Sequence, residues 1–161
     1  MSKALVLSRL QTACVGREYC CGQIRKKLKR QTDMQKITQQ EAEQILQELV
    51  DEKFIDDSRY SSAFIRDKYR LAGWGRRKIE FYLKKEGVAA SVISNAIKEN
   101  YPLDSVEASD ILLRVMKRKF NSLKADEDIR KKREKVIRFA LSRGFEYGEV
   151  IAQFERLYQD F

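Results

Sequence analysis

The most reactive side chains in this sequence are three cysteines, Cys14, Cys20 and Cys21, and an adjacent acidic pair, Asp56-Asp57. An adjacent thiol pair could serve in redox exchange or as two metal ligands. The sequence contains no histidine, however, so the commonest zinc partner and the commonest general base are both missing. An odd number of cysteines does not fit the disulfide framework of a secreted protein. We therefore expect buried free thiols and no metal site.

The acidic pair stands just before a predicted helix, where carboxylates accept hydrogen bonds from free backbone amides. Capping by Asp57 is a better interpretation than acid–base catalysis. The sequence has no Walker loop, no Rossmann fingerprint and no nucleophile elbow. We predict that the protein is not an enzyme and needs no cofactor.

Basic clusters are the strongest functional signal. Arg76-Arg77-Lys78 follows Gly73-Trp74-Gly75 at a predicted helix start, where cations oppose the helix dipole. This unfavourable placement indicates function, and the free amides there could hold a phosphate, although a solvated charged face explains the cluster equally well. Trp74 could stack on a base or a partner. A core or interface role is more usual for a lone tryptophan.

Other basic clusters lie near predicted helix C-termini, where positive charge is favourable without any ligand. They are Arg25-Lys26-Lys27 with Lys29 and Arg30, Lys84-Lys85, and Lys117-Arg118-Lys119. A further cluster, Arg130–Arg133, follows Asp126-Glu127-Asp128, so part of its charge is balanced locally.

The whole chain is basic, with 33 Lys and Arg against 24 Asp and Glu in 161 residues, a net charge of +9. This imbalance favours a polyanionic partner, and nucleic acid is the usual candidate. The first residues do not have the pattern of a signal peptide, and no apolar run approaches the roughly 20 residues that span a bilayer. We expect a soluble cytoplasmic protein that does not contact membranes.

Helices must position these residues, because seven Gly and one Pro are few for so long a chain. Thr38-Gln39-Gln40-Glu41 and Asp104-Ser105-Val106-Glu107 have the form of capping boxes. Gly87 and Gly144 stand where left-handed helix C-caps would need glycine. Apolar residues recur at helical spacing: Leu5, Leu7 and Leu10 open a first helix, and Tyr60, Phe64 and Leu71 lie near one face of a later one.

A repeat underlies this pattern. Steps of four, four, six and four residues connect Ile79, Leu83, Gly87, Ile93 and Ile97. A second series has almost the same steps and consists of Ile137, Leu141, Gly144, Val150 and Phe154. It differs only in the step before the glycine, which is shorter by one residue. The same pattern begins at Ile24 and Leu28 and continues, after an insertion around Gln31 to Ile37, at Ile45 and Leu49.

We therefore predict an all-α fold of three tandem three-helix repeats, residues 1–56, 57–103 and 104–161, that form an elongated, curved molecule. The second repeat has 10 basic and 5 acidic residues, a net charge of +5, whereas the first and the third each carry +2. The second repeat is therefore the best candidate for an anionic contact.

Several segments resemble the RecX family of recombination regulators. The resemblance is strongest in the second repeat, at Asp56–Tyr60, Ala63–Arg66, Gly73–Ile79 and Leu83–Val88. Arg17-Glu18-Tyr19 with Ile24–Leu28, and Arg143-Gly144-Phe145, are also similar to that family. Two departures concern helix starts and leave the fold unchanged: Arg76 stands where the family usually has proline, and Cys20 where it usually has a serine or threonine cap.

The resemblance implies a regulator that binds RecA, lies in the groove of its filament on single-stranded DNA, and inhibits strand exchange and ATP hydrolysis, thereby modulating DNA repair and the SOS response. It also implies a weaker direct contact with DNA. We expect a monomer whose filament or DNA contacts are Arg76, Arg77, Lys78, Lys84 and Lys85, then Arg25, Lys26 and Lys27, and secondarily Arg59 and Arg66. Either of the last two could instead brace adjoining repeats.

Other classes of protein stay open. A plain nucleic-acid-binding module with no RecA role would show steep salt dependence on DNA alone, since binding releases counterions. A helical-repeat scaffold for an acidic protein would not be retained on DNA even at low salt. A helix-turn-helix repressor is less favoured, because such proteins are normally dimers and the sequence has no dimer seam.

Overall fold

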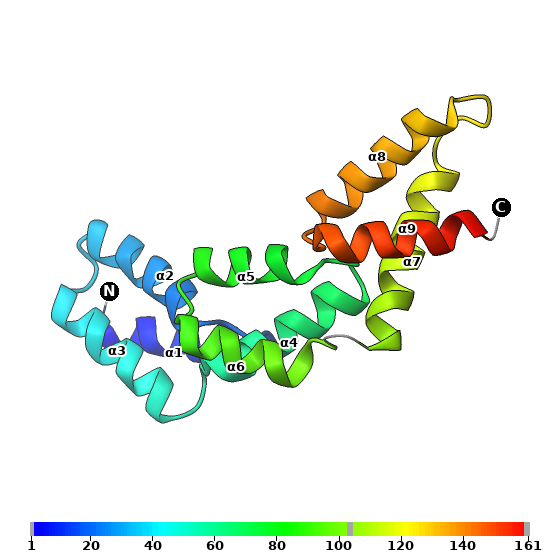
Figure 1. Cartoon of the computed structure of the whole chain (residues 1–161). Helices are drawn as coiled ribbons and strands as arrows, with labels where there is room; N and C mark the ends of the chain where they lie inside the picture. Colours follow the sequence, from blue (N-terminus) through cyan, green and yellow to red (C-terminus); the bar gives the residue numbers. More distant parts are fainter. Residues whose placement is uncertain (1, 103–104, 160–161) are drawn as a thin grey trace. The chain divides into compact units, whose positions relative to one another are not determined.

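The computed structural model describes residues 2–102 and 105–159, and every regular element among them is an α-helix (Figure 1). In chain order the helices are α1 (Lys3–Gly16), α2 (Cys21–Asp33), α3 (Gln39–Asp51), α4 (Asp57–Arg70), α5 (Arg76–Lys85), α6 (Ala90–Asn100), α7 (Val106–Asn121), α8 (Ile129–Ser142) and α9 (Tyr147–Gln159). The predicted all-α fold is confirmed.

The chain divides into two compact units, and the division passes through α4, α5 and α6. The first unit consists of Met1–Ala63 and Leu83–Asn95, and the second of Phe64–Tyr82 and Ala96–Phe161. The predicted boundary between residues 103 and 104 lies outside the described residues, and the bounds of the three repeats remain a prediction. Among the described helices, none has both the length and the apolar character needed to cross a bilayer.

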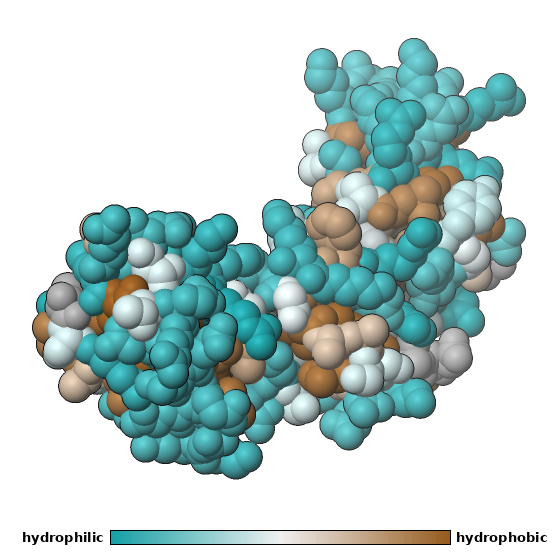
Figure 2. Space-filling model, turned by 90° about the vertical axis from the view of Figure 1, so that its left-hand side faces the viewer, coloured by the Kyte–Doolittle hydropathy of each residue, from teal (hydrophilic) through white to brown (hydrophobic). Residues whose placement is uncertain are grey.

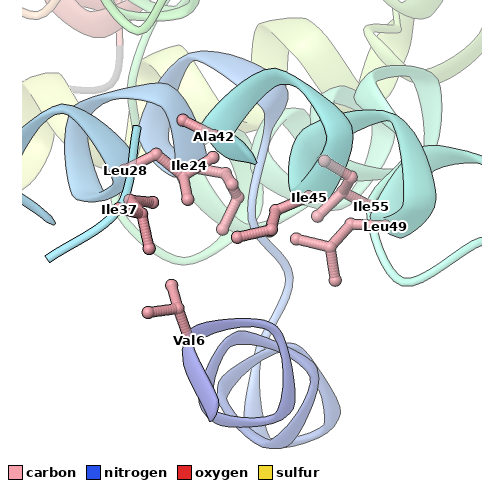
Figure 3. Packing of buried hydrophobic residues seen from close by; sticks show 8 residues of the cluster. All are labelled: Val6, Ile24, Leu28, Ile37, Ala42, Ile45, Leu49 and Ile55. Carbon is pink, nitrogen blue, oxygen red and sulfur yellow. The ribbon is translucent and has the colours of Figure 1, made fainter. Parts of the chain in front are cut away.

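The core of the first unit lies where α1, α2 and α3 meet. It consists of the buried side chains Val6, Ile24, Leu28, Ile37, Ala42, Ile45, Leu49 and Ile55. Figure 3 shows Val6 pointing from α1 toward the side chains of the other helices. The insertion around Gln31 to Ile37 therefore has a packing role, since its last residue is part of this core.

The two predicted capping boxes have different outcomes. At α3 the prediction is confirmed, because Thr38 Oγ1 accepts from Glu41 N at 3.2 Å and Glu41 Oε2 accepts from Thr38 N at 2.7 Å. At α7 the prediction is wrong by one residue: Ser105 is the cap, and its Oγ accepts from Ala108 N at 3.2 Å. Asp104, the predicted cap, lies outside the described residues.

The sequence predicted that Asp57 caps its own helix, α4, and this prediction is wrong. Asp56 has that role, because its Oδ1 accepts from Arg59 N at 3.0 Å. Asp57 Oδ1 instead accepts from Cys21 N at 2.7 Å and so caps the first turn of α2. The acidic pair thus joins the start of α2 to the start of α4 in the first unit.

The alignment of the repeat in α8 is also wrong by one residue. The fully buried positions of α8 are Val136 and Ala140, whereas Leu141 is 37% exposed. With these residues both series have the same steps: Ile79, Leu83, Gly87, Ile93 and Ile97, and Val136, Ala140, Gly144, Val150 and Phe154. Both glycines have the predicted positive φ, 88° at Gly87 and 90° at Gly144.

Two further residues of the apolar pattern are exposed. Leu71 follows the end of α4 and is 81% exposed, and Leu5 is 44% exposed, while the neighbouring Val6 is buried. The face seen in Figure 2 is largely hydrophilic and carries only small apolar patches.

The three cysteines are free, and Cys20 is buried while the other two are partly buried. Burial, followed by the nearby Asp57 carboxylate, raises the pKa of Cys21 from 9.0 to about 11. Burial also raises the pKa of Tyr60 from 10.0 to about 12. Both groups are therefore harder to ionise in the folded protein than in the unfolded chain.

Folding favours the neutral form of both groups, and the stability linked to this preference is fully present below pH 9. It is lost as the pH rises through the folded-state pKa values, about 11 for Cys21 and about 12 for Tyr60. We expect the free energy of unfolding, measured by urea titration, to fall between pH 9 and pH 11. An unchanged free energy of unfolding over this range would contradict the prediction.

Candidate functional site

The basic side chains at the start of α5 are exposed and weakly paired. The Arg77 side chain is 68% exposed, and its ion pair with Glu146 spans 3.8 Å. Arg76 Nε donates to Glu80 Oε1, one turn later in the same helix, at 2.7 Å. Exposed ion pairs contribute only about 0–1 kcal/mol. Either guanidinium can therefore exchange its carboxylate for an external anion with little loss of stability.

The backbone amides at the start of α5 already have partners. Gly75 N and Arg77 N donate to the carbonyl oxygens of residues 143–144, at 2.7 Å and 3.1 Å, and Arg76 N donates to the Tyr101 hydroxyl at 3.2 Å. The hypothesis of a phosphate held by these three amides is therefore wrong. An anion at this helix start would be bound by side chains.

Trp74 lies in a group of aromatic rings beside these cations. Its ring centroid is 6.2 Å from that of Phe64 and 4.9 Å from that of Tyr82. The Nζ atoms of Lys78 and Lys68 lie 4.6 Å and 5.1 Å from the Trp74 ring centroid, within cation–π range. Burial lowers the pKa of Lys78. This packing favours a structural role for Trp74 over stacking on a free base.

Apart from Arg59, the predicted contact residues of the first unit lie on α2 and at the end of α5. The exposed members of this set are Arg25, Lys26, Lys84 and Lys85. Lys27 is partly buried, and its Nζ lies 5.1 Å from the ring centroid of Tyr19. The first unit therefore presents its own group of cations.

The start of α2 and the residues after α5 are in close contact. A Cβ at Gly22 would lie 1.8 Å from Glu86 O, so only glycine allows this approach. Lys26 Nζ lies 3.4 Å from Glu86 Oε2. The cations of α2 and of the end of α5 are thereby brought to one region of the first unit.

Arg59 and Arg66 both have partners in the chain. Arg59 Nε donates to Glu18 Oε1 at 2.7 Å, and its Nη2 donates to the carbonyl oxygens of residues 53–54 at 3.2 Å and 3.3 Å. Arg66 Nη1 donates to Asn100 Oδ1 at 2.9 Å. The contacts of Arg59 reach residues of the first predicted repeat and favour bracing of adjoining repeats. Arg66, by contrast, bonds within its own predicted repeat.

Phe81 is a candidate that the sequence reasoning missed. It is 61% exposed and stands four residues after Arg77 in α5, so both side chains lie on one helix face. Its exposure could have been predicted from helical spacing, because the buried positions Ile79 and Leu83 leave Phe81 on the polar side of the helix. Exposed aromatic rings beside cations are typical of surfaces that bind single-stranded nucleic acid.

Burial raises the pKa of all three thiols. Cys20 Sγ donates to Glu86 O at 3.6 Å, and burial raises the pKa of this thiol. It therefore stays protonated, and poorly nucleophilic, at neutral pH. Within the described ranges, no group of three or more His, Cys, Asp or Glu side chains is placed to hold a metal ion.

Two models of protein domains match consecutive parts of the chain. The model of the second three-helix domain of RecX matches residues 56–97, and the model of the third three-helix domain of RecX matches residues 106–152.

The chain is also similar to proteins named regulatory protein RecX. It is 30% identical to the one from Chlorobium limicola over 118 residues, and this aligned region covers 73% of this chain and 69% of that protein. It is 32% identical over 116 residues to the one from Clostridium tetani, which covers 71% of this chain and 51% of that protein. The chain spans only about half the length of several such relatives.

Two solved structures have a similar fold. The crystal structure of a regulatory protein RecX has a TM-score of 0.81 at 20% identity and covers 95% of this chain and 73% of that chain. The crystal structure of RecX from Lactobacillus salivarius has a TM-score of 0.73 at 18% identity, and the match covers 97% of this chain and 99% of that chain. At these identities the likeness concerns the fold alone.

Proposed function

This chain belongs to the RecX family, and from that premise we propose that it regulates RecA by binding RecA and its filament on single-stranded DNA. In this role it inhibits strand exchange and ATP hydrolysis, and thereby modulates DNA repair and the SOS response. Family membership is the observation that carries the proposal, since both domain models and the relatives named regulatory protein RecX point to it.

The protein acts as a cytoplasmic monomer, without cofactor and without catalysis of its own. Its acidic pair is used in capping, because Asp56 accepts from Arg59 N and Asp57 from Cys21 N. Regulation therefore depends on binding alone. The repeats of residues 1–56, 57–103 and 104–161 serve as successive binding modules.

The contact surface consists of the cations of α2 and α5: Arg76, Arg77, Lys78, Lys84, Lys85, Arg25, Lys26 and Lys27. Most of these side chains are exposed, and basic side chains position proteins on phosphate backbones. Arg59 and Arg66 contribute less, because their guanidinium groups already bond within the chain. Direct binding to DNA is weaker than binding to the filament.

Phe81 adds a contact of another kind. An exposed ring one turn from Arg77 can stack on an unpaired base, an interaction that contributes about 1–3 kcal/mol per base. Duplex DNA offers no such free base, so this residue favours single-stranded DNA.

Binding to immobilised single-stranded DNA, bare or coated with RecA, tests the proposal by biolayer interferometry over a range of salt concentrations. We expect tighter binding to the coated DNA, and binding that persists at salt concentrations that release the protein from bare DNA. Equal affinity for both surfaces with steep salt dependence would favour a plain nucleic-acid-binding module instead. No retention on either surface at low salt would favour a scaffold for an acidic protein.

A further inference from the structure

A hollow of about 180 Å³ in the second unit is lined by four arginines, which are Arg70, Arg114, Arg118 and Arg143. They come from the end of α4, from two successive turns of α7, and from the residue that follows α8. Phe139 of α8, Val115 of α7 and residues 71–73 after α4 complete the lining. None of the four was a predicted contact residue.

Two of these guanidinium groups are held by the segment that follows α4. Arg114 Nη2 donates to Arg70 O at 3.0 Å, and Arg143 Nη1 lies 3.5 Å from Ala72 O. Arg143 Cζ also lies 5.0 Å from the ring centroid of Phe139. A guanidinium has five N–H donors, so this fixation leaves several donors on each group for a ligand. These contacts restrict two of the four side chains before any ligand binds, which lowers the entropy cost of binding.

The hollow carries more positive than negative charge. Arg70 pairs with Glu107 at 3.2 Å, but both side chains are exposed. The other three arginines form no ion pair with any residue that the structure describes. The pKa of Lys78 is lowered first by burial and then by the positive charge of Arg143. A bound anion would neutralise this excess.

We propose that the hollow binds a phosphate group. Planar guanidinium forks match phosphate oxygens with paired hydrogen bonds. The volume of about 180 Å³ is smaller than the roughly 300–1,000 Å³ of sites for whole small molecules, so the site takes the phosphate and not an entire nucleotide. The phosphate belongs either to a nucleic-acid backbone or to a free phosphate or pyrophosphate ion. This site does not depend on RecA. As a site for a nucleic-acid phosphate it rests on the direct DNA contact proposed above, and as a site for free phosphate it goes beyond that function.

The test uses the full chain without RecA and compares it with two variants, Arg118→Gln and Arg114→Gln/Arg118→Gln. Arg118 has no ion pair with a described residue, so the single variant should fold normally. A matched control is Lys98→Gln/Lys124→Gln, which removes two exposed charges elsewhere in the same unit. Two quantities are measured: the melting temperature with pyrophosphate or chloride at equal ionic strength, and the affinity for an oligo(dT) without terminal phosphates.

We expect pyrophosphate to raise the melting temperature of the unmodified protein and of the control, and to raise it much less in both hollow variants. If the phosphate is that of a nucleic acid, oligo(dT) affinity falls on the order of tenfold in the double variant. If only the pyrophosphate effect is lost, the site is one for free phosphate. Pyrophosphate stabilisation and oligo(dT) affinity that are the same in the hollow variants as in the control would overturn the proposal.

Discussion

Replacing Gly144 by alanine is expected to lower the free energy of unfolding by about 3 kcal/mol or more. Gly144 has φ of 90°, a conformation that costs a residue with a Cβ about 1–3 kcal/mol. A Cβ there would also lie 2.4 Å from Lys78 N and 2.5 Å from Lys78 Cβ. Because backbone atoms take part in this overlap, no change of rotamer relieves it, and overpacking adds about 1–3 kcal/mol.

Urea unfolding followed by circular dichroism measures this effect, and Gly148→Ala is the matched control. A Cβ at Gly148, in α9, would meet no atom within 4 Å. Alanine is favoured over glycine inside a helix by about 0.5–1 kcal/mol, so the control should be slightly more stable than the unmodified protein. A loss below about 1 kcal/mol for Gly144→Ala would show that this packing is looser than described.

Reversing charge at the start of α5 is expected to impair the regulator without unfolding it. In Arg77→Glu/Lys78→Glu, we expect the concentration that half-inhibits RecA to rise on the order of tenfold, because repulsion from phosphate replaces attraction. The fold should persist, since the Arg77–Glu146 pair is exposed and the contact of Lys78 with Trp74 contributes only about 0.5–1 kcal/mol.

Lys98→Glu/Lys124→Glu serves as control, because it makes the same change in net charge at two exposed positions outside the predicted contact set. Inhibition by this control should stay within about twofold of the unmodified protein. Equal inhibition by the folded α5 variant and by the control would remove Arg77 and Lys78 from the contact surface.

The features that were predicted correctly from the sequence depend on neighbours in the chain. The Thr38 capping box and the positive φ at Gly87 and Gly144 are decided within a few residues. The register of α8 failed for a reason that is also local. Val136-Ile137 and Ala140-Leu141 are adjacent apolar pairs, so spacing alone does not say which member of each pair is buried.

The features that escaped prediction depend on residues far apart in sequence. Asp57 caps α2 instead of α4, because the Cys21 amide lies within 2.7 Å of its carboxylate. Two amides at the start of α5 donate to the carbonyl oxygens of residues 143–144, and no local sequence pattern predicts this contact. The arginine hollow likewise combines α4, α7 and α8, and its members look like ordinary exposed charges until the helices pack. Phe81, by contrast, was open to prediction from the helical spacing of Ile79 and Leu83.

ATP hydrolysis by RecA on single-stranded DNA, with this protein titrated in well below the RecA concentration, tests the central claim most directly. Regulation through the filament predicts inhibition at this substoichiometric level, because one bound molecule affects many RecA subunits. No inhibition, or inhibition only when the protein is abundant enough to coat the DNA, would contradict the claim and leave a protein that binds nucleic acid without regulating RecA.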